Sequence, residues 1–423
     1  MYKKIISLFL CILILLGTSG CSNPPLKTDV LLQPEQMKED LDCLYKAVVD
    51  THPKIEENNF KNEYDKIYKK LYDKIKKPMT VEKFIFIAEE AVMPFHDAHT
   101  SIFRMNIGSG IKAIPLKFLW LEGGMIVSDN TDLLKKGDKI ISIGNKTPGQ
   151  ILKEMKMVIP AENDMRVKHL SQHFLPYIEY LDKLGLIYKN SVSVKVEHID
   201  GKIQTVKLPL IDATDEWVLN MEPYTYEIKK DNDLAVFHLN ACVEDEGYRE
   251  ILNDFFSEVQ LNGIDKIAVD LRHNTGGDSR VMDEFLRHIK IDDYTGYADR
   301  RVYQICPKVK VYHDDGNLYN GKIYVLTSNA TFSSANWFAV TFKYNKIGTI
   351  VGEPTGNALN CYGNINSFTL PNSKLYVSIS KNNWVSPYMD DSKNTLEPDV
   401  YIPLTREDVV SGNDPCINWI IEN

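Results

Sequence analysis

From residue 233 onward, short apolar runs alternate with longer amphipathic segments. The apolar runs are Asp233–Leu239, Lys266–Leu271, Lys322–Leu326 and Gly348–Val351. The amphipathic segments are Tyr248–Leu261, Met282–Ile289 and Ser333–Tyr344. Continuously apolar strands are typical of a sheet that helices cover on both faces. The pattern therefore predicts an α/β domain with a buried sheet.

The residues before this pattern divide into two parts. Residues 34–95 carry apolar positions at helical spacing, for example Met37, Leu41 and Leu44. Residues 101–210 instead contain short β-like runs, with a helical stretch over 150–188. A chain of 423 residues exceeds what one hydrophobic core usually supports. We therefore predict a helical N-terminal domain over 34–100, a β-rich insert with a helical extension over 101–212, and an α/β core over 213–423.

The N-terminus has the composition of an export signal. Lys3 and Lys4 precede an apolar run over 5–16, and small residues then lead to Cys21. The run is too short to span about 30 Å of hydrocarbon as a helix, so we predict a signal peptide over 1–21. The sequence before Cys21 is similar to a bacterial lipobox, and 22–33 is expected to be a tether. We therefore predict an exported protein, lipid-anchored through Cys21 on the extracytoplasmic face of the cell membrane; ordinary secretion is the alternative.

Charge and cysteine usage narrow the partners further. The formal net charge is -9, which argues against nucleic acid or anionic lipid as a partner. The cysteines after Cys21 are widely spaced and form no CxxC pair, so neither a disulfide framework nor a cysteine-based zinc site is indicated. We expect these cysteines to be small core residues.

Polar motifs follow three of the predicted strands, and another lies at a predicted helix end. They are HDAHTSI (96–102), VDLRHNTGGDS (269–279), YVLTSNATFSSANWFA (324–339) and VGEPTG (351–356). Each has an ordinary structural explanation: Ser333 as a helix N-cap, Gly276–Gly277 as a tight turn, and His99 as a hydrogen-bonded structural histidine. Together they supply a hydroxyl, an imidazole base and glycine N–H groups for an oxyanion. The set therefore favours a serine hydrolase.

These motifs resemble those of the tail-specific, or C-terminal-processing, serine proteases, in the branch related to tricorn protease and interphotoreceptor retinoid-binding protein. The matching stretches, in order, are DAHT (97–100), KKGDKIISIGNKT (135–147), DLRHNTGG (270–277), TFSSAN (331–336), GEPTG (352–356) and LEPDVYIP (396–403). The resemblance implies a crotonase-like spiral α/β core and a PDZ-like identity for the insert. It implies no metal or organic cofactor.

The resemblance also assigns roles to residues. It implies that Ser333 is the nucleophile, and that the N–H of Ser334, with that of Gly276 or Gly277, forms the oxyanion hole. One branch of the family activates its serine with a downstream lysine, but the corresponding stretch here, GNALNCYG, has none. The histidine of the other branch is His99, which is therefore expected to be the base.

The chain departs from the family pattern at three positions. Ala98 stands where tricorn protease has a serine, and Asn336 replaces a glutamate of the nucleophile motif. Ser392 stands where active relatives carry a late glutamate. The adjacent carboxylates are Asp390 and Asp391, and we predict that Asp391 takes the missing orienting role.

The resulting functional prediction is a surface-anchored serine endopeptidase that cleaves peptides or unfolded protein tails through an acyl-enzyme. The alternative is a catalytically inactive lipoprotein of the same fold that binds a peptide or an apolar ligand. Hydrolysis of a small ester or amide would use the same residues and differ in pocket size.

Overall fold

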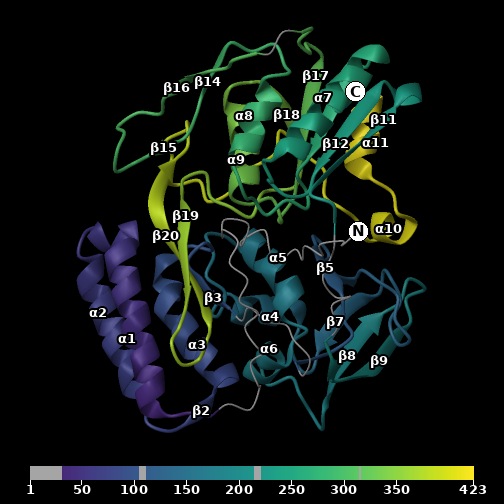
Figure 1. Cartoon of the computed structure of the whole chain (residues 1–423). Coiled ribbons are helices and arrows are strands. Elements are labelled where there is room, and N and C mark those ends of the chain that lie inside the picture. The colour runs from purple at the N-terminus through teal and green to yellow at the C-terminus, as the bar shows by residue number, and fades with distance from the viewer. Residues whose placement is uncertain (1–30, 104–110, 214–220, 314–315) are drawn as a thin grey trace, which may run out of the picture.

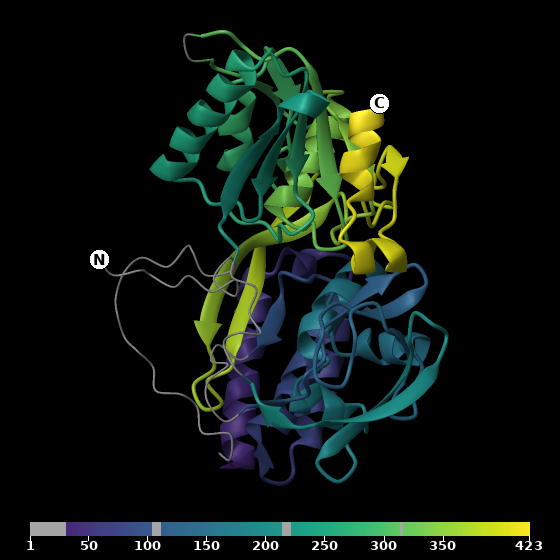
Figure 2. The same ribbon diagram turned by 90° about the vertical axis from the view of Figure 1, so that its right-hand side faces the viewer.

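The computed structural model describes residues 31–103, 111–213, 221–313 and 316–423. The predicted signal peptide, Cys21 and most of the predicted tether therefore lie outside the described residues. The chain forms two lobes joined by a long β-ribbon (Figures 1 and 2). No helix in the described ranges is long and apolar enough to cross a membrane.

The upper lobe is built on the strand–helix pattern that begins at residue 233. Its six-stranded sheet has the order β11-β12-β13-β17-β18-β21, and only the β11–β12 pair is antiparallel. The strands are β11 (Tyr224–Lys229), β12 (Leu234–Leu239), β13 (Lys266–Asp270), β17 (Lys322–Thr327), β18 (Thr349–Gly352) and β21 (Val400–Tyr401). The helices are α7 (Glu246–Leu261), α8 (Arg280–Leu286), α9 (Ser334–Tyr344) and α11 (Pro415–Glu422). Helix α10 (Arg406–Ser411) lies at the junction of the lobes, where Val409 packs with Leu121 and Ile126.

Side chains from both faces of this sheet are buried, as the apolar runs predict. Phe237 and Val269 pack in one cluster with residues of α7, α8 and α9. Val236 and Leu326 belong to a second cluster, which includes Ile420 of α11 on the opposite face. The layered arrangement leaves the carboxyl ends of the parallel strands pointing toward the lower lobe (Figure 1).

The lower lobe combines the N-terminal helices with the insert. It contains α1 (Pro34–Thr51), α2 (Phe60–Lys74), α3 (Val81–Val92) and the short 3-10 turns η2 (Pro53–Glu56) and η3 (Met93–Phe95). The insert has an antiparallel sheet of β5 (Phe118–Leu121), β6 (Gly124–Val127), β7 (Lys139–Ile143), β8 (Ser191–Glu197) and β9 (Ile203–Pro209), with α4 (Pro148–Met155), α5 (Asp164–Phe174) and α6 (Ile178–Lys183). One hydrophobic cluster runs through both parts. The domain boundaries and the PDZ-like identity of the insert stay predictions.

Local sequence explains several element ends. Helix α1 ends at Thr51 because Pro53 disfavours a helical conformation at His52. Helix α4 starts with a capping box between Thr147 and Gln150 and a proline at its first position. Asn163 caps α5 by accepting the N–H of Arg166.

A two-stranded ribbon joins the lobes. It consists of β19 (Cys361–Thr369) and β20 (Tyr376–Val385), and β20 also pairs with β3 (Ser101–Phe103) and β15 (Ala298–Asp299). The ribbon descends from the upper lobe along the N-terminal helices (Figure 1). At the far end of the ribbon, Phe368–Leu370 and Leu375–Ile379 are apolar runs on either side of a Pro-Asn-Ser turn, which is typical of a hairpin. Nearer the upper lobe each strand carries two asparagines, which favour turns over strands. Tertiary pairing overrides that preference.

The tip of the ribbon is held by Asp40 of α1. Its carboxylate is fully buried and accepts the N–H groups of Asn372 and Ser373, each at 2.8 Å. The remaining short pairs in the chain are β1 (Leu31–Leu32) with β2 (Met79–Thr80), β4 (Lys112–Ala113) with β10 (Ile211–Asp212), and β14 (Asp293–Thr295) with β16 (Lys308–Lys310).

We expect Asp40→Ala to lower the free energy of unfolding by about 2–3 kcal/mol, because the buried N–H of Ser373 and the half-buried N–H of Asn372 lose a charged acceptor. Thermal or urea unfolding of the purified protein measures this loss. Asp50→Ala, which removes an exposed carboxylate from the same helix, is the matched control. An equal effect of the two substitutions would contradict a role of Asp40 in holding the ribbon.

Candidate active site

Ser333 lies directly after the loop that follows β17, at the N-terminus of α9. Its backbone has φ 53° and ψ -127°, a conformation that costs roughly 1–3 kcal/mol for a residue with a side chain. The N–H of Ser333 donates to Oδ1 of Asn357 at 2.9 Å. This hydrogen bond holds the unusual backbone, and the start of α9 adds the positive end of a helix dipole.

The structure brings His99 to Ser333 across 234 positions of sequence, with Nε2 2.9 Å from Oγ. The other ring nitrogen, Nδ1, lies 3.4 Å from Oδ1 of Asp97. The N–H of His99 donates to the same carboxylate oxygen at 2.9 Å. We assign the ring proton to Nδ1, since it faces the carboxylate, which leaves Nε2 as the acceptor for the serine proton.

Asp97 is fully buried and is held by further donors. Its Oδ2 atom accepts from Nε2 of His52 at 3.2 Å, Oγ1 of Thr100 at 2.7 Å and Oγ of Ser380 at 2.6 Å. His52 donates through Nε2 because its Nδ1 accepts the N–H of Lys54. Burial alone would raise the pKa of Asp97, but hydrogen bonds from His52 and His99 hold that pKa well below its usual value. Asp97 therefore stays ionised beside the imidazole.

The glycine turn approaches Ser333 closely. A Cβ on Gly276 would lie 2.5 Å from Cβ of Ser333, so only glycine fits there. The N–H of Gly276 donates to Oδ1 of Asn274 at 2.8 Å. Within the described ranges, the N–H groups of Gly277 and Ser334 have no acceptor, while Oγ of Ser334 donates to the carbonyl of Gly277 at 2.7 Å. This geometry favours Gly277 over Gly276 as the partner of Ser334 in an oxyanion hole.

Asp391 does not lie where the sequence predicts an orienting carboxylate. Its Oδ1 accepts from Nη2 of Arg300 at 2.6 Å and from Nδ2 of Asn360 at 2.7 Å, and its side chain is 64% exposed. Its described hydrogen bonds and ion pairs do not include His99. The placement of Asp391 is therefore corrected: the carboxylate that faces Nδ1 of His99 is Asp97, two residues away in the same motif.

Glu162, which no sequence motif indicates, also reaches the site. It lies between α4 and α5, and its Oε1 accepts from Nδ2 of Asn357 at 3.1 Å. Its Oε2 is buried and has no partner among the described residues, as is also true of Nδ1 of His99 by strict hydrogen-bond geometry. Burial, and then the charge of Asp97, raise the pKa of Glu162 to about 8.

Asp97, His99 and Glu162 each offer an atom within 4.8 Å of the others. Among the residues that the structure describes, they form the one set of three such side chains close enough to hold a metal ion. The donor set is equally that of a histidine between two carboxyl groups, which suits proton transfer at Nε2.

The ring of Phe332 contacts both His99 and a buried cation. Phe332 lies with its ring centroid 4.5 Å from that of His99, and Cζ of Arg166 lies 3.7 Å from the Phe332 centroid. Burial lowers the pKa of Arg166 to about 10, against the opposing effect of Glu162. Arg166 thus stays charged at neutral pH.

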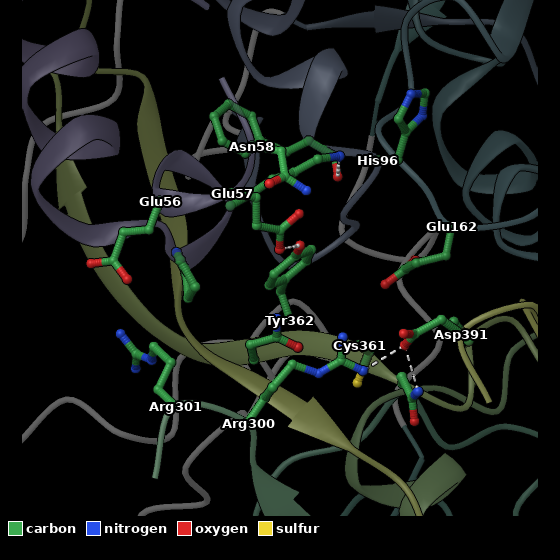
Figure 3. A pocket seen from close by; sticks show the side chains of 16 residues that line it. Glu56, Glu57, Asn58, His96, Glu162, Arg300, Arg301, Cys361, Tyr362 and Asp391 are labelled. Atoms are coloured by element: carbon green, nitrogen blue, oxygen red, sulfur yellow. Dashed lines mark hydrogen bonds and ion pairs between the residues drawn. The ribbon is translucent and has the colours of Figure 1, made fainter. Parts of the chain in front are cut away.

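A cavity of about 730 Å³ adjoins the site (Figure 3). Glu162 and Asp391 line it, together with Arg300, Glu57 and Tyr362. Glu57 accepts from the hydroxyl of Tyr362, as the dashed line in Figure 3 shows. The walls carry charges of both signs, and Glu162 connects this cavity to Asn357, which contacts Ser333.

A serine hydrogen-bonded to a histidine, with a buried carboxylate 3.4 Å from the other ring nitrogen and a glycine turn and a helix N-terminus alongside, is the arrangement of serine hydrolases. Residues 233–402 match the family model described as Peptidase family S41. The α/β core is therefore similar to that of the tail-specific S41 proteases, which supports a serine-type peptidase. No curated protein matches the sequence.

Solved structures share the fold. The structure of mature CPAF complexed with lactacystin is 12% identical, covers 92% of this chain and 97% of that chain, and has a TM-score of 0.69. Another structure of mature CPAF, also 12% identical, gives 0.67 over 89% of this chain and 94% of that chain. A putative peptidase from Parabacteroides merdae is 15% identical over 92% and 96%, with a TM-score of 0.50. The predicted α/β fold class is thereby confirmed, whereas the PDZ-like identity of the insert stays a prediction.

The raised pKa of Glu162 predicts a pH dependence of stability. Its pKa is about 8 in the folded protein against a usual value of 4.5. Between these values the folded state binds a proton that the unfolded state releases, so this group's contribution to stability falls as pH rises from about 4.5 to about 8. We expect Glu162→Gln to remove this decline, so that its melting temperature rises relative to wild type across that range. If the melting temperatures of wild type and Glu162→Gln changed in parallel with pH over this range, the raised pKa of Glu162 would be contradicted.

Proposed function

We propose that this protein is an exported, lipid-anchored serine endopeptidase that cleaves peptides or unfolded protein tails. Ser333 is its nucleophile and His99 its general base. The observation that carries the proposal is the 2.9 Å contact between Nε2 of His99 and Oγ of Ser333, with Asp97 on the far side of the ring.

The arrangement supports an acyl-enzyme mechanism. As Oγ of Ser333 attacks the peptide carbonyl carbon, Nε2 of His99 takes the hydroxyl proton, and the buried Asp97 stabilises the imidazolium. The carbonyl oxygen gains negative charge facing the N–H groups of Gly277 and Ser334. His99 then gives the proton to the leaving amine. Water, deprotonated by His99, hydrolyses the ester and restores Ser333.

The departures from the family pattern support a second candidate function, which is non-catalytic binding of a peptide or an apolar ligand. Asn336 and Ser392 lack the carboxylates of active relatives. The contact geometry at Ser333 favours catalysis, and the experiment below separates the two functions.

We expect a fluorophosphonate probe to label the soluble protein, produced from Ser22 onward, and to leave Ser333→Ala unlabelled. His99→Ala should lower the labelling rate roughly 10²–10⁴-fold, because the general base is lost. Ser411→Ala, which removes an exposed hydroxyl on α10, is the matched control and should label like wild type. A folded wild-type protein that is not labelled would support the binding function instead. Casein digestion then separates proteolysis from hydrolysis of small esters or amides.

The proposed anchor rests on the sequence before and at Cys21. We expect mass spectrometry of the membrane fraction to find a lipid-modified Cys21 as the mature N-terminus. Cys21→Ser should abolish the modification and release the protein from the membrane fraction. Cys11→Ser, which alters a cysteine in the predicted signal peptide, should change neither result. An unmodified N-terminus at or beyond Ser22 in the wild type would indicate ordinary secretion.

A further inference from the structure

Glu162 comes from a different part of the chain than the other site residues. Asp97 and His99 follow the N-terminal helices, and Ser333 belongs to the α/β core. Glu162 lies in the insert, at the turn from α4 to α5. The insert therefore delivers a carboxyl group into a site that the other two parts assemble.

Asn357 connects Glu162 to the nucleophile. The side-chain amide donates from Nδ2 to Oε1 of Glu162 at 3.1 Å and accepts the N–H of Ser333 on Oδ1 at 2.9 Å. Because an amide has one accepting and one donating end, the acceptor at Glu162 fixes which end faces Ser333. Loss of that acceptor would free the amide to rotate, and Ser333 would lose the bond that holds its strained backbone.

Glu162 also offers a carboxylate oxygen to the group formed with Asp97 and His99, whose atoms lie within 4.8 Å of one another. Asp97 already accepts from His52, Thr100 and Ser380, and its contact with Nδ1 of His99 is long at 3.4 Å. A second carboxyl group beside the imidazole limits the positions that the ring adopts. Glu162 thus restrains both members of the serine–histidine pair: Ser333 through Asn357, and His99 through its own carboxyl group.

The turn that carries Glu162 is locked to the α/β core. Nδ2 of Asn163 donates to the carbonyls of Thr355 at 3.2 Å and Asn394 at 2.6 Å. Three residues further on, Arg166 packs on Phe332, the residue before the nucleophile. These contacts hold Glu162 at a fixed depth in the site.

We propose that Glu162 is a positioning residue for the serine–histidine pair, supplied by the insert in the role that the sequence assigns to Asp391. The proposal rests on the proposed peptidase function. It requires the insert to be docked on the core through Asn163 and Arg166 before Ser333 and His99 are fully aligned.

The test compares rates of fluorophosphonate labelling, and kcat and KM on a casein-derived peptide, among matched variants. Glu162→Ala should lower the labelling rate and kcat on the order of 10²-fold, as a small misplacement of reacting groups does, with little change in KM. Glu162→Gln should recover most of the loss, because its amide oxygen still accepts from Asn357. Asp164→Asn alters an exposed carboxylate in the same turn, paired with Lys156, and should match wild type.

Asp391→Asn tests the rival position and should also retain the wild-type rate. The proposal is overturned if Glu162→Ala is labelled as fast as wild type. It is also overturned if Asp391→Asn lowers the labelling rate and kcat as much as Glu162→Ala does. Should Glu162→Ala fail to fold, Asn163→Ala keeps the carboxyl group but removes its docking bonds, and a reduced kcat at unchanged KM supports the proposal. An unlabelled wild type would refute the peptidase function itself, whereas a labelled wild type with an equally labelled Glu162→Ala refutes only this inference.

Discussion

The buried carboxylate of Asp97 is the interaction on which the site depends. It joins three segments far apart in the sequence: His52 at the end of α1, the turn through His99 and Thr100, and Ser380 on the ribbon strand β20. A buried charge is tolerated only when donors surround it, so its burial and its partners stabilise one another. The same anion that fixes the ribbon against the N-terminal helices therefore also orients the base. The hydrogen bonds of Asp97 therefore both stabilise the packing of the lower lobe and orient the catalytic base.

The lobes meet at a place where neither contains a complete site. The upper lobe contributes a serine and N–H donors at the carboxyl ends of its strands, which is where α/β sheets generally place their sites. The lower lobe contributes the base and both carboxyl groups. Asn357 bridges the two, since one end of its amide contacts Ser333 and the other contacts Glu162. The ribbon adds a covalent link across the same junction.

The sequence predicts the strand–helix order, the nucleophile region and the proximity of His99 to Ser333, because local periodicity and ordered motifs carry that information. It does not predict Glu162, which lies in an unremarkable turn and matters only through the docking of the insert. Asp391 shows the converse: its position near the chain end suggests a role, but Arg300 and Asn360 hold it at the surface. The sequence also does not predict the ribbon strands near the upper lobe. The asparagines there adopt strand conformation because β20 pairs with both β15 and β19. What sequence misses in each case is a tertiary partner.

The substitution at Asn336 illustrates why a missing motif residue does not by itself dismantle a site. Asn336 is fully buried, accepts from Oγ1 of Thr355 at 2.8 Å and donates to the carbonyl of Ala358 at 3.2 Å. Those contacts clamp the turn on both sides of Asn357, which in turn holds the backbone of Ser333. A neutral amide performs this clamping without placing another charge near Glu162 and Asp97, where a third carboxylate would raise the desolvation cost. The exchange at 336 is thus consistent with a site whose second carboxyl group arrives from the insert.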